Sequence, residues 1–107
     1  MMTMMMMMWV SRFDGVRNFS VLRVHVNNLF QRDVRVFAAA TVWVGDHHAT
    51  ATDGRVRFEY RRDSLSESAR SVSVPLHHLV ASTLTVQLEF DARWIMLSEI
   101  QFDSSEL

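Results

Sequence analysis

The stretch that decides the fold is residues 83–102, TLTVQLEFDARWIMLSEIQF. Over residues 83–90, apolar side chains alternate with polar ones, which predicts a strand with one buried and one solvated face. Residues 94–102 are apolar at both parities through Leu97, which predicts a central strand covered on each face. Because only the short polar break of residues 91–93 separates the two runs, we predict an antiparallel hairpin. The rest of the chain must then supply the sheet that covers it.

Four more strands are predicted from alternating or β-branched patterns. The clearest of them has Val56, Phe58 and Tyr60 on its inner face. In another, residues 37–40 break the alternation, and the β-branched residues on both sides favour a bulge or bend there over a helix. Pro75 cannot donate to a ladder, so its strand either ends there or lies at an edge. The four predicted strands are residues 16–26, 34–44, 55–60 and 71–75.

Turns and loops separate the predicted strands. Asp14-Gly15 leads into the first strand and Asn27-Asn28 leads out of it, because both pairs tolerate positive φ. Residues 61–69 are polar and rich in Ser, which predicts a loop. Strands with turns at short spacing and no amphipathic helix predict an all-β protein, either a sandwich or a barrel.

Length and composition limit the classes of protein to consider. A chain of 107 residues argues for one domain at most, and 49% hydrophobic with 21% charged residues is typical of a globular protein. The formal net charge of -1 gives no reason to expect nucleic acid or an anionic membrane as partner. The chain contains no Cys, which excludes disulfides, thiolate metal ligands and a Cys nucleophile.

Residues 1–8, MMTMMMMM, form a low-complexity start. They lack the basic region and small-residue cleavage site of a secretory signal. A Met-rich clamp on a hydrophobic partner is one interpretation. We favour another, a translated trinucleotide repeat at a wrongly assigned start, and therefore leave these residues out of the fold prediction.

The five His residues are candidate zinc ligands. They include two adjacent pairs, and zinc requires three or four converging ligands. Adjacent strand residues point to opposite faces, so each pair offers at most one ligand, and His25 is the remaining candidate. We expect solvated loop His instead. The pairs are His47-His48 and His77-His78.

The remaining chemical motifs are weak. Arg55, Arg57, Arg61 and Arg62 could form a basic stripe, but a charged outer strand face is the favoured interpretation. The chain shows no nucleophile elbow and no phosphate-cradling Gly loop, so no enzyme activity is predicted. Asn18, in Asn-Phe-Ser, fits the N-glycosylation acceptor pattern, which matters if the domain is extracellular.

Five separated segments resemble the discoidin domain receptors, specifically the second, discoidin-like domain of the ectodomain. The resemblance implies an antiparallel jelly-roll-type β-sandwich, of which this chain is an incomplete part. It also implies parent proteins that are receptor tyrosine kinases and bind collagen through the preceding discoidin domain. That domain and the kinase are absent from this chain, so no catalysis is implied. The segments are residues 13–19 (FDGVRNF), 24–28 (VHVNN), 69–78 (ARSVSVPLHH), 81–82 (AS) and 94–100 (WIMLSEI).

The resemblance further implies part of a calcium site. A Ser-Glu pair on the last strand of the family's domain matches Ser98 and Glu99, and such oxygen ligands suit a hard cation. The other ligands would come from residues before Phe13, so this chain alone is expected to bind calcium poorly. The family also has Cys where this chain has Val26 and Val86, which are expected to be near neighbours across the core. A third family Cys matches Val42.

These observations combine into one expected organisation. Residues 1–12 are a low-complexity segment, 13–103 a partial discoidin-like domain and 104–107 a tail. The expected function is a non-catalytic extracellular module that supports the collagen-binding domain at the outer side of the plasma membrane, compatible with a receptor dimer. One alternative is an independent sandwich that binds carbohydrate or protein, and another is a small His-metal hydrolase.

Overall fold

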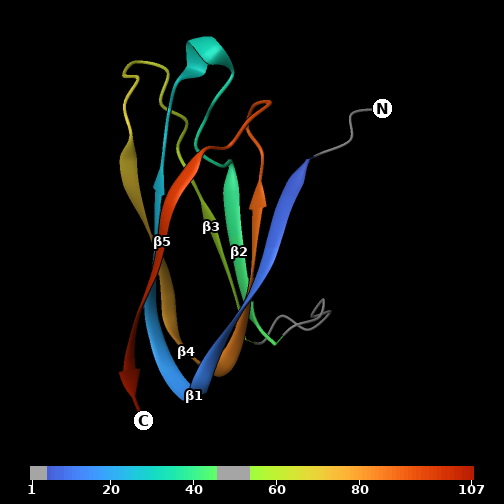
Figure 1. Ribbon diagram of the computed structural model, residues 1–107, viewed down its shortest axis with the longest axis vertical. Coiled ribbons are helices and arrows are strands. Elements are labelled where there is room, and N and C mark those ends of the chain that lie inside the picture. The colour runs from blue at the N-terminus through green and yellow to red at the C-terminus, as the bar shows by residue number, and fades with distance from the viewer. Residues whose placement is uncertain (1–4, 46–53) are drawn as a thin grey trace.

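The computed structural model describes residues 5–45 and 54–107 (Figure 1). The described residues form an all-β protein with one antiparallel five-stranded sheet, in the order β3-β2-β4-β1-β5. A single 3-10 turn, η1, spans Phe30–Arg32. The strands are β1 (Met6–Val26), β2 (Ala39–Val44), β3 (Arg55–Glu59), β4 (Arg70–Glu89) and β5 (Leu97–Glu106).

The sheet bends so that its two halves face each other as layers. β1 and β4 are the two long strands, and both run through the bend at the lower end of Figure 1. In the first layer, residues 84–89 of β4 pair with β2 and residues 83–89 pair with the start of β1. In the second layer, residues 70–81 of β4 pair with the end of β1, which also pairs with β5. The arrangement is consistent with the predicted discoidin-like β-sandwich.

The bend is built from two bulges, which we call the corner. In β1, residues 13–16 lie opposite the single residue Ser82, and in β4, residues 76–78 lie opposite Ser20. Extra residues on one strand bend it and increase its twist. Gly15 has φ 94°, a left-handed conformation that glycine adopts without steric cost. The expected turn at Asp14-Gly15 is therefore a bulge inside β1, not the start of a strand.

The core fills the space between the two layers. Side chains from the first layer, such as Val42 and Leu88, and from the second, such as Leu22 and Val74, are fully buried in one cluster. Burying each such side chain contributes about 1.5–3 kcal/mol. At one end, the Phe19 ring packs 4.7 Å from Phe13 and 5.8 Å from Phe102, between centroids. This aromatic group joins β5 to both halves of β1.

The predicted hairpin is wrong. β4 and β5 do not pair with each other, because β1 lies between them in the sheet. β5 is also not a central strand, since within the described residues it pairs with β1 alone. Trp94, Met96 and Ile100 are 55%, 51% and 37% exposed. Ile95 and Leu97, at the other parity, pack against the core. The run is therefore apolar on both faces although only one of the two is covered.

Of the other predicted strands, one is confirmed and two have different bounds in the structure. β3 is confirmed, with Val56, Phe58 and Tyr60 packed on the core. The bend predicted in residues 37–40 occurs at Ala38, so only Ala39–Val44 forms β2. β4 does not end at Pro75 but continues to Glu89. Over residues 70–81, however, its described partner is β1 alone, so Pro75 does lie on a local edge.

The ends of the chain also differ from expectation. Met6 to Met8 are part of β1 opposite residues 87–89 of β4, and Met7 and Trp9 pack against the core. Leaving them out of the fold was wrong, whatever the origin of the Met run. At the other end, β5 continues to Glu106, so most of the predicted tail is strand. No helix in the described ranges is long and apolar enough to cross a bilayer.

Val26 and Val86 belong to the same fully buried cluster, on opposite layers. That the Cβ atoms of Val26 and Val86 lie close together remains a prediction. Val86 is the direct cross-strand partner of Val42, the third position at which the family carries Cys.

Candidate functional site

Ser98 and Glu99 lie near the start of β5, and both are exposed. The register shifts by one residue here, since His25 pairs with Glu99 and Val26 pairs with Leu97. Ser98 is thus the extra residue of a bulge, and its hydroxyl donates to the His25 carbonyl at 3.2 Å. The bulge fixes the Ser98 side chain against β1 and leaves the Glu99 carboxylate in solvent.

Glu99 ends a row of polar side chains across the outer face of the second layer. Because Val24 and Val26 point into the core, His25 between them lies on the outer face, with Ser71 on one side and Glu99 on the other. Arg23 and Gln101 form the neighbouring row, and together these five residues line a shallow hollow of about 70 Å³. In the sequence, each of these residues alternates with inward-facing ones, which places it on the outer face of its strand. Only the pairing of β1 with β4 and β5 brings the five residues together.

This row does not form a hydrolase triad. A Ser, a His and a carboxylate on neighbouring strands have the residue types of one, but a triad needs the His hydrogen-bonded to both others. In the described part of the chain no side-chain hydrogen bond joins His25 to Ser71 or to Glu99. The row is therefore a polar surface that lacks the hydrogen bonds of a triad.

The donor set fits a metal ion only in part. Calcium takes six to eight oxygen ligands. Within residues 5–45 and 54–107, no group of three or more His, Asp or Glu side chains could hold a metal ion. Ser98 and Glu99 offer at most three side-chain oxygens, and the Ser98 hydroxyl already donates to a backbone carbonyl. What this chain supplies is one free carboxylate beside a hydroxyl.

The neighbouring charges on the outer face are paired. Arg23 donates from Nε and Nη2 to one oxygen of Asp103 on β5, at 2.9 and 2.7 Å. Hydrogen bonding to Asp103, with its charge, raises the pKa of Arg23. This pair ties β1 to β5 beside the hollow.

The predicted glycosylation residue and the His pairs fall in different places. Asn18 is half-buried in β1, between Val80 of β4 and Ser105 of β5, and its Oδ1 lies 3.3 Å from His78 Nδ1. His77 and His78 are exposed at the corner, both at positive φ, as expected for solvated His. The pair His47-His48 lies outside the described residues.

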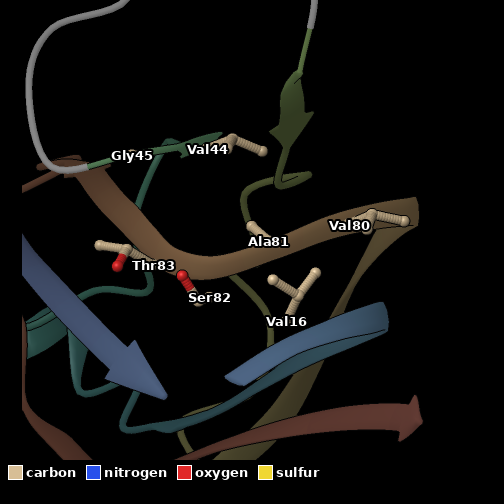
Figure 2. Close-up of a pocket in the computed structure, with 7 residues that line it drawn as sticks. All are labelled: Val16, Val44, Gly45, Val80, Ala81, Ser82 and Thr83. Carbon is tan, nitrogen blue, oxygen red and sulfur yellow. The ribbon is translucent and has the colours of Figure 1, made fainter. Parts of the chain in front are cut away.

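A second hollow, of about 390 Å³, lies beside the corner (Figure 2). Val16 of β1, Val44 and Gly45 at the end of β2, and residues 80–83 of β4 line it. Gly45 is held there by its N–H, which donates to the Thr83 carbonyl at 2.9 Å, and by its carbonyl, which accepts from the Thr85 hydroxyl at 2.6 Å. None of the described side chains that line it is titratable, so the described residues bring neither acid–base groups nor charged ligands to this hollow.

The sequence did not predict a polar network around Asn28. Asn28, expected to form part of a turn, is buried and donates from Nδ2 to the carbonyls of Asp63 and Ser66, at 3.1 and 2.9 Å. Arg70 Nη1 donates to Asp63 Oδ2 at 2.6 Å, and Arg70 Nη2 to the Ser66 carbonyl at 2.9 Å. The feature that distinguishes Asn28 from an ordinary turn residue is its burial. Burial is not visible in the sequence, so this role could not be predicted.

Asp63 is the centre of this network. Its Oδ1 accepts from the backbone N–H groups of Leu65 and Ser66 at 2.8 and 3.2 Å. The hydrogen bond from Arg70, followed by these two, lowers the pKa of Asp63 to about 2. These contacts hold the loop of residues 61–69 in one conformation, and they serve structure rather than chemistry.

Two of the four Arg residues considered as a basic stripe form ion pairs. Arg57 forms ion pairs with Glu59 and with the buried Glu89 of β4, and Arg62 pairs with Asp91. This arrangement agrees with the charged outer strand face that was expected.

Comparison with known proteins gives a consistent result. The family described as discoidin domain-containing receptor 1/2, DS-like domain, matches residues 3–104. The chain is 30% identical to discoidin domain-containing receptor tyrosine kinase B of Caenorhabditis elegans, over 87% of this chain and 12% of that protein. It is 32% identical to the human epithelial discoidin domain-containing receptor 1, over 86% of this chain and 10% of that protein. The chain thus spans about a tenth of the length of the curated relatives it matches. It belongs to the discoidin domain receptor family, and the part of that family it matches is the DS-like domain.

Proposed function

We propose that this chain is a non-catalytic extracellular module of a collagen-binding receptor tyrosine kinase, and that it supports the domain that contacts collagen. The observation that carries the proposal is the family match over residues 3–104. The polar groups agree with a supporting role, since the hydrogen bonds of Asn28 and Arg70 hold loop 61–69. A rigid β scaffold is a suitable spacer between a ligand-binding domain and a membrane anchor.

A binding comparison on immobilised fibrillar collagen tests the proposal. The 107-residue chain is compared with the ectodomain of its receptor that includes the preceding domain. We expect the ectodomain to bind and the chain alone to give no saturable signal. Saturable binding by the chain alone, at an affinity close to that of the ectodomain, would favour the alternative of an independent binding module.

We also propose that Ser98 and Glu99 contribute ligands to a calcium site of the whole receptor. The exposed Glu99 carboxylate beside the Ser98 hydroxyl supports this, because both are oxygen donors. Calorimetric titration with Ca²⁺ should detect binding to the ectodomain and only very weak binding to the chain. Glu99→Gln should weaken the ectodomain's calcium affinity about tenfold or more, while Glu106→Gln, at the far end of β5, serves as the control. Equal affinities for both variants would contradict the assignment.

We propose Asn18 as an N-glycan acceptor in secreted material. Phe19 points into the core, so its neighbour Asn18 lies on the outer face of the second layer. Secretion from mammalian cells should give a glycosidase-sensitive mass shift that is lost in both Asn18→Gln and Ser20→Ala. An unshifted wild-type mass would refute it.

A further inference from the structure

The acceptor triplet Asn18-Phe19-Ser20 lies inside the sheet of the second layer and not in a loop. In this layer β1 runs between β4 and β5 (Figure 1). Asn18 pairs with Val80 on one side and with Ser105 on the other. Phe19, in the middle of the triplet, is fully buried. The backbone of the triplet is therefore held from both sides, and its central side chain is part of the core.

Each neighbouring strand also holds one polar group of the triplet. The Ser20 hydroxyl donates to the Asp103 carbonyl of β5 at 3.2 Å. On the other side, Asn18 Oδ1 lies 3.3 Å from His78 Nδ1 of β4. Because an amide oxygen only accepts, the ring nitrogen of His78 is the donor. The amide of Asn18 and the hydroxyl of Ser20 are thus both engaged within the fold.

The acceptor pattern itself defines what a glycosylating enzyme has to reach. Asn-X-Ser specifies two side chains, the amide that receives the sugar and the hydroxyl two residues later. An enzyme that contacts both must also bind the backbone of the residue between them. In the folded chain β5 holds the hydroxyl, β4 holds the amide oxygen and the core holds Phe19. The whole triplet cannot be bound without displacing strands.

The partners that close the triplet lie far downstream in the sequence. His78 comes 60 residues after Asn18, and Asp103 comes 83 residues after Ser20. At synthesis rates of about 5–20 residues per second, Asp103 is added roughly 4–17 s after Ser20. Pairing between such distant segments is also slow compared with local contacts. The triplet is therefore open in the growing chain before its partners exist.

We propose that Asn18 accepts a glycan only before β4 and β5 pair with β1 around it, so that closure of the second layer ends the time available for modification. This inference rests on the proposed role of Asn18 as an N-glycan acceptor. In the transfer, Asn18 Nδ2 forms a bond to the sugar C1 atom and loses a proton. The bond from C1 to the pyrophosphate of a lipid-linked oligosaccharide breaks, and the lipid pyrophosphate leaves with the electron pair.

A glycan attached early is compatible with the final fold. Since Phe19 points into the core, Asn18 points to the outer face of the second layer. Its cross-strand partners Val80 and Ser105 are both exposed on that face. The sugar therefore remains in solvent when the strands pair, and the order of the two events decides whether Asn18 is modified.

Purified oligosaccharyltransferase with a lipid pyrophosphate-linked oligosaccharide tests this on the complete 107-residue chain. Leu22→Asp places an unpaired charge in the core between Val74 and Phe102, which should unfold the second layer and leave the triplet intact. Met96→Asp adds the same charge at a position that is 51% exposed and should keep the fold. Circular dichroism checks both states. Intact mass should show glycan addition at least tenfold faster in Leu22→Asp than in wild type or Met96→Asp.

The outcomes separate this inference from the acceptor assignment. Equal rates for folded wild type and Leu22→Asp would overturn the inference and leave Asn18 as an acceptor. No addition to Leu22→Asp, or addition that persists when Asn18→Gln is combined with it, would overturn both. The order of addition gives a second measurement on wild type. Enzyme and donor present throughout cell-free translation should modify the chain, and the same components added after folding should not. Equal modification in both orders would contradict the inference.

Discussion

Loop 61–69 and strand β5 use their side chains in opposite ways. The loop has no regular structure and most of its residues are exposed, Leu65 to 96%, yet Asn28, Asp63 and Arg70 hydrogen-bond to its carbonyl and amide groups. β5 is a regular strand, yet Ile100 on it and Met96 just before it are left exposed. A loop can therefore be fixed by a few hydrogen bonds that are only partly buried, while a strand at an edge is stabilised on one side only.

The largest effect should come from the aromatic group that attaches β5 to the core. Phe19→Ala removes a fully buried ring that packs on Phe13 and Phe102, so we expect a loss of about 3–5 kcal/mol in the free energy of unfolding. Ile100→Ala, on the exposed edge, should cost less than about 1 kcal/mol. Urea denaturation of both variants measures the difference, and equal losses would show that β5 is covered as fully as β1.

A smaller effect is expected from the loop. Asn28→Ala removes one donor each from the Asp63 and Ser66 carbonyls, which still accept from Arg35 and Arg70, so each lost hydrogen bond should cost about 0.5–1.5 kcal/mol. Hydrogen exchange should speed up in residues 61–69 and not in β5. Leu65→Ala, on the same loop but 96% exposed, is the control and should change neither stability nor exchange. An unchanged exchange pattern in Asn28→Ala would mean that Arg35 and Arg70 hold the loop without Asn28.

The smallest effect is a pH dependence of the same loop. The folded pKa of Asp63 is about 2, below the ordinary value of 3.8, so the ionised carboxylate is favoured in the folded protein. Its contribution is therefore present above about pH 4 and is lost as the pH falls toward 2. Protection factors of the loop amides, corrected for the pH dependence of intrinsic exchange, should fall in wild type between pH 5 and 2, and Asp63→Asn should remove that fall. A wild-type profile that matches Asp63→Asn would show that Asp63 does not control the loop.

Much of the fold could be predicted because alternation reports which face of a strand is buried. Val56, Phe58, Val72 and Leu88 were all placed correctly on inner faces for that reason. The site was less accessible. Ser98 and Glu99 came from resemblance alone, and their row with His25 appears only when β1 pairs with β5.

The sequence by itself determined the all-β class, the inward residues of most strands and the family, because side-chain periodicity and specific segments are written locally. Only the tertiary structure decided that β1 separates β4 from β5, that two bulges fold one sheet into two layers, and that β5 lies at an edge. The physical reason is that every strand presents the same backbone donors and acceptors, so a local pattern does not specify its partner. Apolar residues on both faces can likewise mean either two covering layers or an uncovered edge.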